Sequence, residues 1–326
     1  RCNERVEVNY LIYFTLLYYD LQIQRFRFII FIVKVTIFSM EKINEYGETL
    51  EQFLKNYDEN KYRRPSNTVD MILFTVYEGN LKVLLVKRKN HPFIGDWAMP
   101  GGFIEFEEDM EQAVLRELKE ETSISKYTYF RQLYTFGNAD RDPRTRIITT
   151  VYLSMTPSGN IKNTHASDDA KDARWFNISK KTISSTQKGR KSLLCLVNDQ
   201  EDIHICYEIK DNAKRNYVES KSKWLEKKSN AMLAADHIKA INMAMDILKS
   251  RVASTGILFN LLPNECTLRQ IQDAYEAVIG HKVDTGNFRR DIKKMLIDTG
   301  KKTKGIGKRA SLYQFNPMYD FLKENL

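Results

Sequence analysis

The chain has 326 residues, of which 42% are hydrophobic and 29% are charged, and this composition excludes a disordered or fibrous protein. The length is sufficient for two ordinary domains, and the formal net charge of +9 permits a polyanionic partner. The cysteines form no C-x-x-C pair and no histidine lies at zinc spacing, so we expect reduced thiols in a cytoplasmic protein.

The first part of the chain, residues 1–39, is rich in Tyr, Phe and Ile, and Met40 is the first methionine. Its longest uncharged apolar run, residues 8–19, is shorter than the roughly 20 residues that a membrane-spanning helix needs. One hypothesis is a membrane or amphipathic anchor. The other, which we favour, is a non-native or disordered extension before a protein that starts at Met40, with no membrane partner.

A pattern of short apolar runs separated by turn residues begins after Pro65, which ends a short helical segment within residues 40–64. The turn Glu78-Gly79-Asn80 joins two such runs, so we expect a β-hairpin there. The predicted strands are residues 68–77, 81–88, 128–136, 146–155 and 173–176.

An acidic loop followed by an acidic helix occupies residues 102–124. Apolar residues recur in it at helical spacing. Glu117, Glu120 and Glu121 are three and four residues apart, so their carboxylates fall on one face of the helix. Like charges at this spacing repel each other, and a helix that keeps them together usually needs a cation. Oxygen ligands of this kind suit Mg²⁺ or Mn²⁺.

This stretch resembles the Nudix box, G-x5-E-x7-R-E-U-x-E-E-x-G-U, in which U is an aliphatic residue. One position differs, because Ser123 stands where the family has Gly. The alternative, a solvated acidic helix face, does not account for so many fixed positions at fixed spacing. The matching residues are Gly102, Glu108, Arg116, Glu117, Leu118, Glu120, Glu121 and Ile124.

The resemblance implies an α/β (α+β) fold, an α/β/α sandwich around a mixed sheet. It also implies hydrolysis of a nucleoside diphosphate linked to another moiety, with ADP-ribose as the first candidate. Mg²⁺, or Mn²⁺, would neutralise the diphosphate and lower the pKa of a bound water. Glu108 and Arg116 fit the family's supporting ion pair. The expected catalytic residues are Glu117, Glu120, Glu121, Arg116 and Glu108, and the expected metal ligands are Glu117, Glu120, Glu121 and Gly101.

Two segments beside the box are similar to substrate-binding parts of the family. The run Trp97-x-x-Pro-Gly-Gly precedes the box, and residues 137–144, GNADRDPR, follow it. A surface turn is the default interpretation of the second segment. In Nudix-related regulators, however, a similar loop faces the nucleotide, and guanidinium groups bind diphosphate oxygens with paired hydrogen bonds. The expected substrate-binding residues are Arg141, Arg144, Phe136 and Glu105.

Residues 184–230 show no recognisable chemistry, and we expect a hairpin insertion or an elaborated linker. A long helix is predicted for residues 231–252, opened by Asp236 and His237. An Asp-His pair occupies this place in similar Nudix-regulator chains, whereas a surface or capping role is the usual one for a single histidine on a helix.

The C-terminal part combines a capped helix (267–279), a basic helix (285–297), a basic hairpin (300–309) and a strand (311–315). This order is typical of a winged helix-turn-helix. Residues 281–311 contain ten Lys or Arg against three Asp, a charge that suits phosphate neutralisation on double-stranded DNA. The expected DNA-binding residues are Arg289, Arg290, Lys293, Lys294, Lys304, Lys308 and Arg309.

Two functions follow from the resemblance to Nudix-related transcriptional regulators. The first is a Mg²⁺-dependent diphosphatase that carries a DNA-binding winged helix. The alternative is a regulator of NAD or sugar metabolism that uses the Nudix domain mainly as a ligand sensor. The complete set of box carboxylates favours retained hydrolysis. A homodimer is expected from the resemblance and because a two-fold dimer matches the two half-sites of a palindromic operator. The predicted segments are 1–39, 40–64, 65–183 (Nudix domain), 184–230 (insertion) and 231–326 (winged helix with its leading helix).

Overall fold

The fold was obtained as a computed structural model. It describes residues 20–27, 42–124, 127, 129–158, 172–304 and 309–320. The chain separates into two compact units, Arg1–Arg64 and Pro65–Leu326.

Among its described residues, the first unit contains two short exposed helices. Residues 20–27 are helical, and most of the predicted extension 1–39 lies outside the described residues. The second helix, α2 (Leu50–Asn56), begins with a capping box in which Thr49 and Gln52 each bond the other's backbone. Within the described ranges, no helix is long and apolar enough to cross a membrane.

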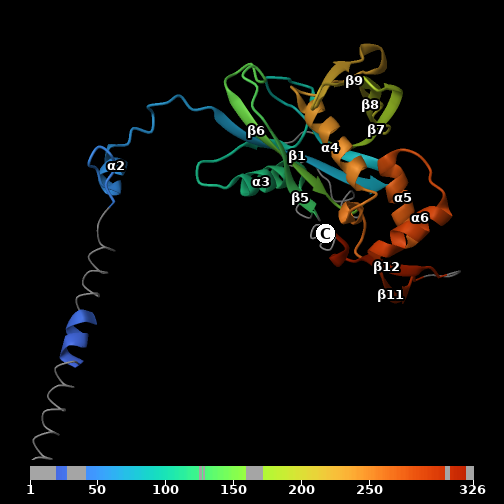
Figure 1. Cartoon of the computed structure of the whole chain (residues 1–326). Helices are drawn as coiled ribbons and strands as arrows, with labels where there is room; N and C mark the ends of the chain where they lie inside the picture. Colours follow the sequence, from blue (N-terminus) through green and yellow to red (C-terminus); the bar gives the residue numbers. More distant parts are fainter. Residues whose placement is uncertain are drawn as a thin grey trace, which may run out of the picture. The chain divides into compact units, whose positions relative to one another are not determined.

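The second unit (Figure 1) is built on a mixed sheet with the strand order β10-β9-β8-β7-β2-β1-β6-β5. The predicted hairpin is present as β1 paired antiparallel with β2, while β1 and β6 run parallel. Short strands β3 and β4 attach to β2 and β1. The bounds are β1 (Ser66–Tyr77), β2 (Asn80–Lys87), β3 (Trp97–Ala98), β4 (Gly101–Phe103), β5 (Tyr129–Phe136), β6 (Ile147–Met155), β7 (Ala173–Thr186), β8 (Gly189–Asn198), β9 (Ile203–Ala213) and β10 (Val218–Trp224).

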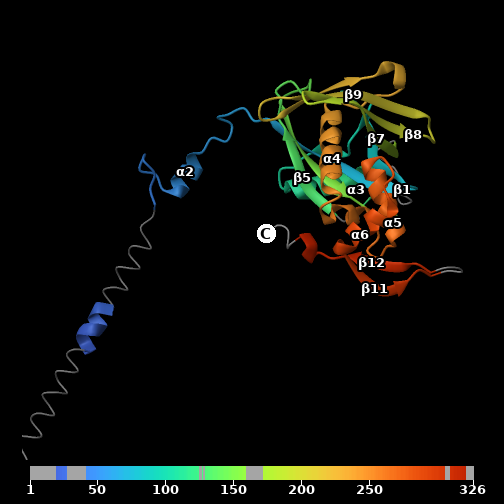
Figure 2. The ribbon, with the colours of Figure 1, turned by 45° about the vertical axis from the view of Figure 1, so that its right-hand side comes forward.

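Both faces of the sheet are covered. Successive side chains of a strand point to opposite faces, and on β1 Ile72 and Phe74 join one buried cluster while Met71 and Leu73 join another. Helix α4 (His237–Arg251) packs into the first cluster and α3 (Met110–Thr122) into the second (Figures 1 and 2). The expected α/β/α sandwich is therefore confirmed. Helix α4 begins later than the predicted residue 231.

Residues 184–230 are part of this sheet. Strands β8, β9 and β10 continue it beyond β7 as an antiparallel meander. The predicted strand 173–176 is extended to Thr186, so the proposed boundary at residue 183 falls inside β7. Buried and half-buried residues alternate along β8, so one face of this strand is packed in the core.

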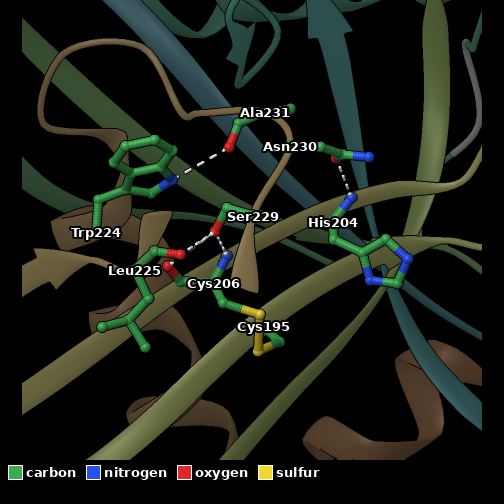
Figure 3. Close-up of a disulfide and its surroundings, with 8 residues drawn as sticks. All are labelled: Cys195, His204, Cys206, Trp224, Leu225, Ser229, Asn230 and Ala231. Carbon is green, nitrogen blue, oxygen red and sulfur yellow. Dashed lines mark hydrogen bonds between the residues drawn. A yellow bond between two sulfur atoms is a disulfide. The ribbon is translucent and has the colours of Figure 1, made fainter. Parts of the chain in front are cut away.

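A disulfide crosses β8 and β9 (Figure 3). Cys195 and Cys206 are direct partners in the strand register and are bonded, with Cα atoms 4.2 Å apart. The prediction of reduced thiols is wrong for this pair, because the strand pairing brings together two cysteines that the sequence leaves scattered. The backbone N–H of Cys206 also donates to the hydroxyl of Ser229, at 2.9 Å. Cys266 is free and buried.

The C-terminal elements form the predicted helix, helix and wing. They are a 3-10 helix η3 (Gly256–Leu261), α5 (Leu268–Ile279), α6 (Thr285–Ile292), a 3-10 turn η4 (Lys293–Met295), β11 (Leu296–Lys302) and β12 (Ser311–Phe315). The predicted helix 285–297 is too long. Its last part leaves the helix because Leu296 starts the wing and pairs with Phe315.

Helix α4 joins the sheet to the winged helix. Figures 1 and 2 show it beside α5, and residues of both helices share a buried cluster with the sheet. Ile241 and Leu248 of α4 lie in this cluster with Ile271 of α5 and Phe74 of β1. The sheet, the linking helix and the winged helix therefore have one continuous core.

Candidate functional site

Helix α3 carries the acidic residues of the box, and Arg116 connects them. Its Nε and Nη2 donate to the two carboxylate oxygens of Glu108, at 3.0 and 2.6 Å. Its Nη1 donates to Glu117 and Glu120, at 2.8 and 3.2 Å, and Nη2 also reaches the carbonyl of Phe103. The Arg116 hydrogen bonds hold the pKa of Glu108 below its ordinary value. The ion pair expected of Glu108 and Arg116 is present, and it fixes the loop before α3 against the helix.

The backbone at Ser123, where α3 ends, explains why the family has glycine at this position of the box. Ser123 caps α3 in the left-handed conformation, with φ 59°, a region that glycine enters without steric cost. Its backbone N–H still donates to the carbonyl of Lys119, at 2.9 Å. Ser123 therefore maintains the turn geometry, at the cost of strain that glycine would not have.

Glu117 and Glu121 lie against the glycines that precede the box. The backbone N–H of Gly101 donates to Glu121, at 2.9 Å. A Cβ added to Gly102 would lie 2.2 Å from a carboxylate oxygen of Glu117, so a larger residue there would displace that carboxylate from its position against the backbone. The pKa of Glu121 is raised to about 8, mainly by burial and in part by the nearby charges of Glu117 and Asp70, while the Gly101 hydrogen bond opposes the rise.

These residues fit a divalent cation by the chemistry of their donors. Burial also raises the pKa of Glu117, while Arg116 lowers it. Buried carboxylates that oppose each other's ionisation are stabilised by a cation. Among the described side chains, no group of three or more His, Cys, Asp or Glu is arranged closely enough to be a ready-made metal cluster. Glu120 is turned towards Arg116, with a side chain that is 55% exposed.

A cavity of about 310 Å³ lies beside these residues. Its lining includes Gly101 and Glu121 as well as Arg141 and Arg144. Arg144 is held by both oxygens of Asp142, at 3.0 and 2.9 Å, and lies over the ring of Phe103. The predicted metal-binding and diphosphate-binding segments therefore meet at one cavity.

Two predicted substrate-binding residues lie elsewhere. Phe136 is buried, with 7% of its surface exposed, and packs edge-on against Tyr134. Glu105 is exposed, and its backbone N–H donates to Glu108. Neither residue is among those that line the cavity, so their predicted contact with substrate stays a prediction.

Three residues that line the cavity or bond its lining were not predicted to have a role there. Asp70 is buried within β1 and accepts a hydrogen bond from Thr149. The sequence could have indicated this role, because Asp70 is a single acidic residue inside the apolar run TVDMILF. Asp236, at the start of α4, bonds Arg141, and His237 is buried and lines the cavity. The surface or capping role expected of His237 is wrong.

The winged helix presents a basic surface. Ile292 and Met295 point into the core, while the neighbouring basic side chains are exposed. Lys308 lies outside the described residues. The predicted DNA-binding residues that are exposed are Arg289, Arg290, Lys293, Lys294, Lys304 and Arg309.

Known proteins with similar sequences share both parts of this arrangement. The NUDIX domain model matches residues 67–195. An ADP-ribose pyrophosphatase of Methanocaldococcus jannaschii is 39% identical over 140 residues, which are 42% of this chain and 78% of that protein. The chain belongs to the Nudix family. Its C-terminal part is a winged helix, since the model of the NrtR DNA-binding winged helix domain matches residues 258–315.

Longer similarities include the link between the two domains. The ADPR responsive transcriptional repressor NtrR of Acinetobacter baylyi is 28% identical over 278 residues, covering 83% of this Nudix protein and 90% of the repressor. A MutT/nudix family protein from Enterococcus faecalis has a TM-score of 0.60 at 28% identity, covering 82% of this chain and 94% of its own. Shewanella oneidensis NrtR complexed with a 27mer DNA has a TM-score of 0.53 at 28% identity, covering 77% and 94%.

Proposed function

We propose that this Nudix protein is a Mg²⁺-dependent diphosphatase for ADP-ribose or a similar nucleoside diphosphate, and that it binds double-stranded DNA through its winged helix. The observation that carries the proposal is the complete set of box carboxylates, with Glu108 paired to Arg116 and Glu121 facing the cavity. The similarity to an ADP-ribose pyrophosphatase supports this substrate class.

The roles of the residues follow from their placement. Glu117, Glu120 and Glu121, with the backbone at Gly101, would hold the cation, which supplies charge neutralisation and an acidified water when bound. Glu108 fixes Arg116 and thereby the orientation of the helix. Arg141 and Arg144 are suited to the diphosphate because guanidinium groups bind its oxygens in pairs. Val86, Phe93 and Ala98 contribute apolar side chains to the lining of the cavity.

The test is ADP-ribose turnover with Mg²⁺ by the intact chain and by Glu120→Gln. We expect the parent to release AMP and ribose 5-phosphate, and the variant to lose about 100-fold or more in kcat, the range typical of a lost charged catalytic group. Glu111→Gln removes an exposed charge from the first turn of the same helix and should leave turnover unchanged. Absence of turnover by the parent on any dinucleotide-type substrate would overturn the enzymatic half.

A ligand-sensing regulator is the second candidate. It is favoured by the similarity to an ADPR responsive repressor along most of both chains and by the engagement of Glu117 and Glu120 with Arg116. In that case ADP-ribose binds in the cavity without being cleaved, and DNA affinity changes when it binds. The turnover measurement separates the two candidates, because a sensor binds ADP-ribose and releases no AMP.

A cytoplasmic homodimer is the form that we propose for either function. Operators for winged helix proteins are commonly palindromic, and a two-fold dimer matches the two half-sites. Sedimentation of the intact chain with and without a duplex measures the mass directly, and a monomer on DNA would contradict this proposal.

A further inference from the structure

The segment that leads into α4 runs beside β3 as a short parallel ladder. The N–H of Trp97 donates to the carbonyl of Met232, at 3.0 Å, and the N–H of Ala234 donates to the carbonyl of Trp97, at 2.8 Å. In a parallel ladder the next donor, the N–H of Met99, would bond the carbonyl of Ala234.

That backbone partner is already in use. The chain turns at Ala235, with φ 46°, and the carbonyl of Ala234 accepts from the N–H of His237, at 3.3 Å. The Nδ1 of His237 takes its place and accepts the N–H of Met99, at 3.0 Å. A side chain of the linking helix therefore supplies the last hydrogen bond of a ladder in the Nudix sheet. A buried N–H that loses such a partner costs free energy.

The segment held by His237 is the one that forms the metal-binding backbone. Two residues beyond Met99, Gly101 donates to Glu121, at 2.9 Å. Gly101 itself is tightly placed, since a Cβ there would lie 2.2 Å from the carbonyl oxygen of Val69. A shift of Met99 would therefore strain the closely packed Gly101 and the hydrogen bond that Gly101 makes with the Glu121 carboxylate.

A second contact ties the start of α4 to the same cavity. Arg141 donates to Asp236, at 2.9 Å, with only 7% of the arginine side chain exposed. Within the described part of the chain, Arg141 Nε and Asp236 Oδ2 are buried without a hydrogen-bond partner. The diphosphate arginine thus keeps a free donor, and the linking helix contacts the site at two adjacent residues.

We propose that His237 is a positioning residue of the Nudix metal site, acting through Nδ1 on the Met99 N–H. This inference rests on the proposed metal-dependent function and adds that the metal site is incomplete without the helix that leads to the DNA-binding domain. The imidazole contacts neither the cation nor the reacting atoms. Its effect is the placement of Gly101 and Glu121.

The test compares His237→Asn, His237→Gln and His237→Ala in the intact chain, with Mn²⁺ as the probe and free Mn²⁺ measured by electron paramagnetic resonance. Asn places an amide oxygen where Nδ1 stands, whereas Gln places it near Nε2. We expect His237→Asn to keep the parent's Mn²⁺ affinity. His237→Gln and His237→Ala should bind Mn²⁺ about tenfold more weakly, as happens when an outer-shell partner is lost.

His204→Gln is the matched control, because His204 is on β9 and its side chain bonds the exposed Asp202; the Mn²⁺ affinity of this variant should not change. Equal Mn²⁺ affinity in the Asn and Gln variants of His237, whether parent-like or weak, would overturn the inference and leave the proposed function intact. No Mn²⁺ binding by the parent would overturn both. If His237→Gln does not fold, His237→Asn is compared with His237→Ala instead. The Asn variant should keep the parent's Mn²⁺ affinity and the Ala variant should lose it, and equal affinity in the two would overturn the inference.

Discussion

Ser123 stands at the one box position where the chain differs from the family pattern. The left-handed backbone there, with φ 59°, is the same conformation in which Gly280 ends α5, with φ 85°. The two helix ends therefore need the same geometry and use different residues for it. Strain of this kind is of the order of 1 kcal/mol for a non-glycine residue.

Replacing the serine should therefore stabilise the protein. We expect Ser123→Gly to raise the free energy of unfolding by about 1 kcal/mol, because the strain is removed. Urea denaturation followed by circular dichroism measures it. The reverse exchange, Gly280→Ser, should lower stability by a similar amount, since its Cβ would meet only Lys249 Nζ, at 3.9 Å. A destabilised Ser123→Gly would contradict this account of the turn.

The sequence predicts some site residues and misses others for a physical reason. Glu108, Arg116 and the glutamates of α3 lie within one short motif, so helical spacing alone places them together. His237 and Met99 are 138 residues apart. Their contact depends on a parallel ladder that no local pattern encodes, and His237 on its own reads as an ordinary helix residue.

The turn between α5 and α6 is organised by Glu276. Its carboxylate accepts from Gln272 and from the N–H of Val283, at 2.9 and 3.2 Å, and pairs with Lys282, at 2.7 Å. The Lys282 hydrogen bond is the main cause that lowers the pKa of Glu276 to about 2, from an ordinary 4.5. The carboxylate thus fixes the angle at which α6 leaves the turn.

Glu276→Gln should destabilise the protein by about 1 kcal/mol at neutral pH. A carboxyl group with a lowered folded pKa stabilises above its unfolded pKa and loses that contribution as it is protonated. The difference from the parent should therefore shrink as the pH falls below about 4.5 towards about 2. Urea midpoints at a series of pH values measure it. Asp273→Asn removes the exposed pair with Arg269 and should cost under about 0.5 kcal/mol. A pH-independent difference for Glu276→Gln would contradict the assignment.

The basic surface of α6 and η4 should contribute to DNA affinity through phosphate contacts. Lys293→Ala is expected to weaken binding to a labelled duplex and to reduce the salt slope of the affinity by about 1. Fluorescence anisotropy over a range of salt concentrations measures it. Lys221→Ala removes the same charge from β10, at the far end of the sheet order, and should leave the salt slope unchanged. ADP-ribose turnover should be unchanged in both variants. A parent-like salt slope for Lys293→Ala would show that Lys293 makes no phosphate contact and would contradict this assignment of the DNA-binding surface.

Elements with strong local signals were predicted well. The β1–β2 hairpin, α3 and the capped helix α5 each begin or turn at residues that are neighbours in the sequence and have a strong turn or capping preference. Strands β8 to β10 and the disulfide between Cys195 and Cys206 depend on pairing within the sheet. The end of α6 is decided by the pairing of Leu296 with Phe315, which lies outside any helical pattern.

At the scale of the whole molecule, α4 connects the cavity to the DNA-binding domain. Its first residues, Asp236 and His237, contact Arg141 and Met99, and its later residues share the core with α5. A single packed helix therefore links the cavity to the winged helix. Packed cores of this kind shift between discrete arrangements rather than deforming continuously.

The two candidate functions can coexist, and we propose as the central claim that one chain cleaves ADP-ribose and that its DNA binding responds to ADP-ribose. A time course tests this claim. Labelled duplex, selected from a random pool with this protein, is bound by the intact chain with Mg²⁺, and ADP-ribose is added while anisotropy and AMP release are followed together. We predict a change in the bound fraction that reverses as AMP accumulates, and a change that persists in Glu120→Gln. A bound fraction that ignores ADP-ribose, or a change that persists equally in parent and variant, would contradict the claim.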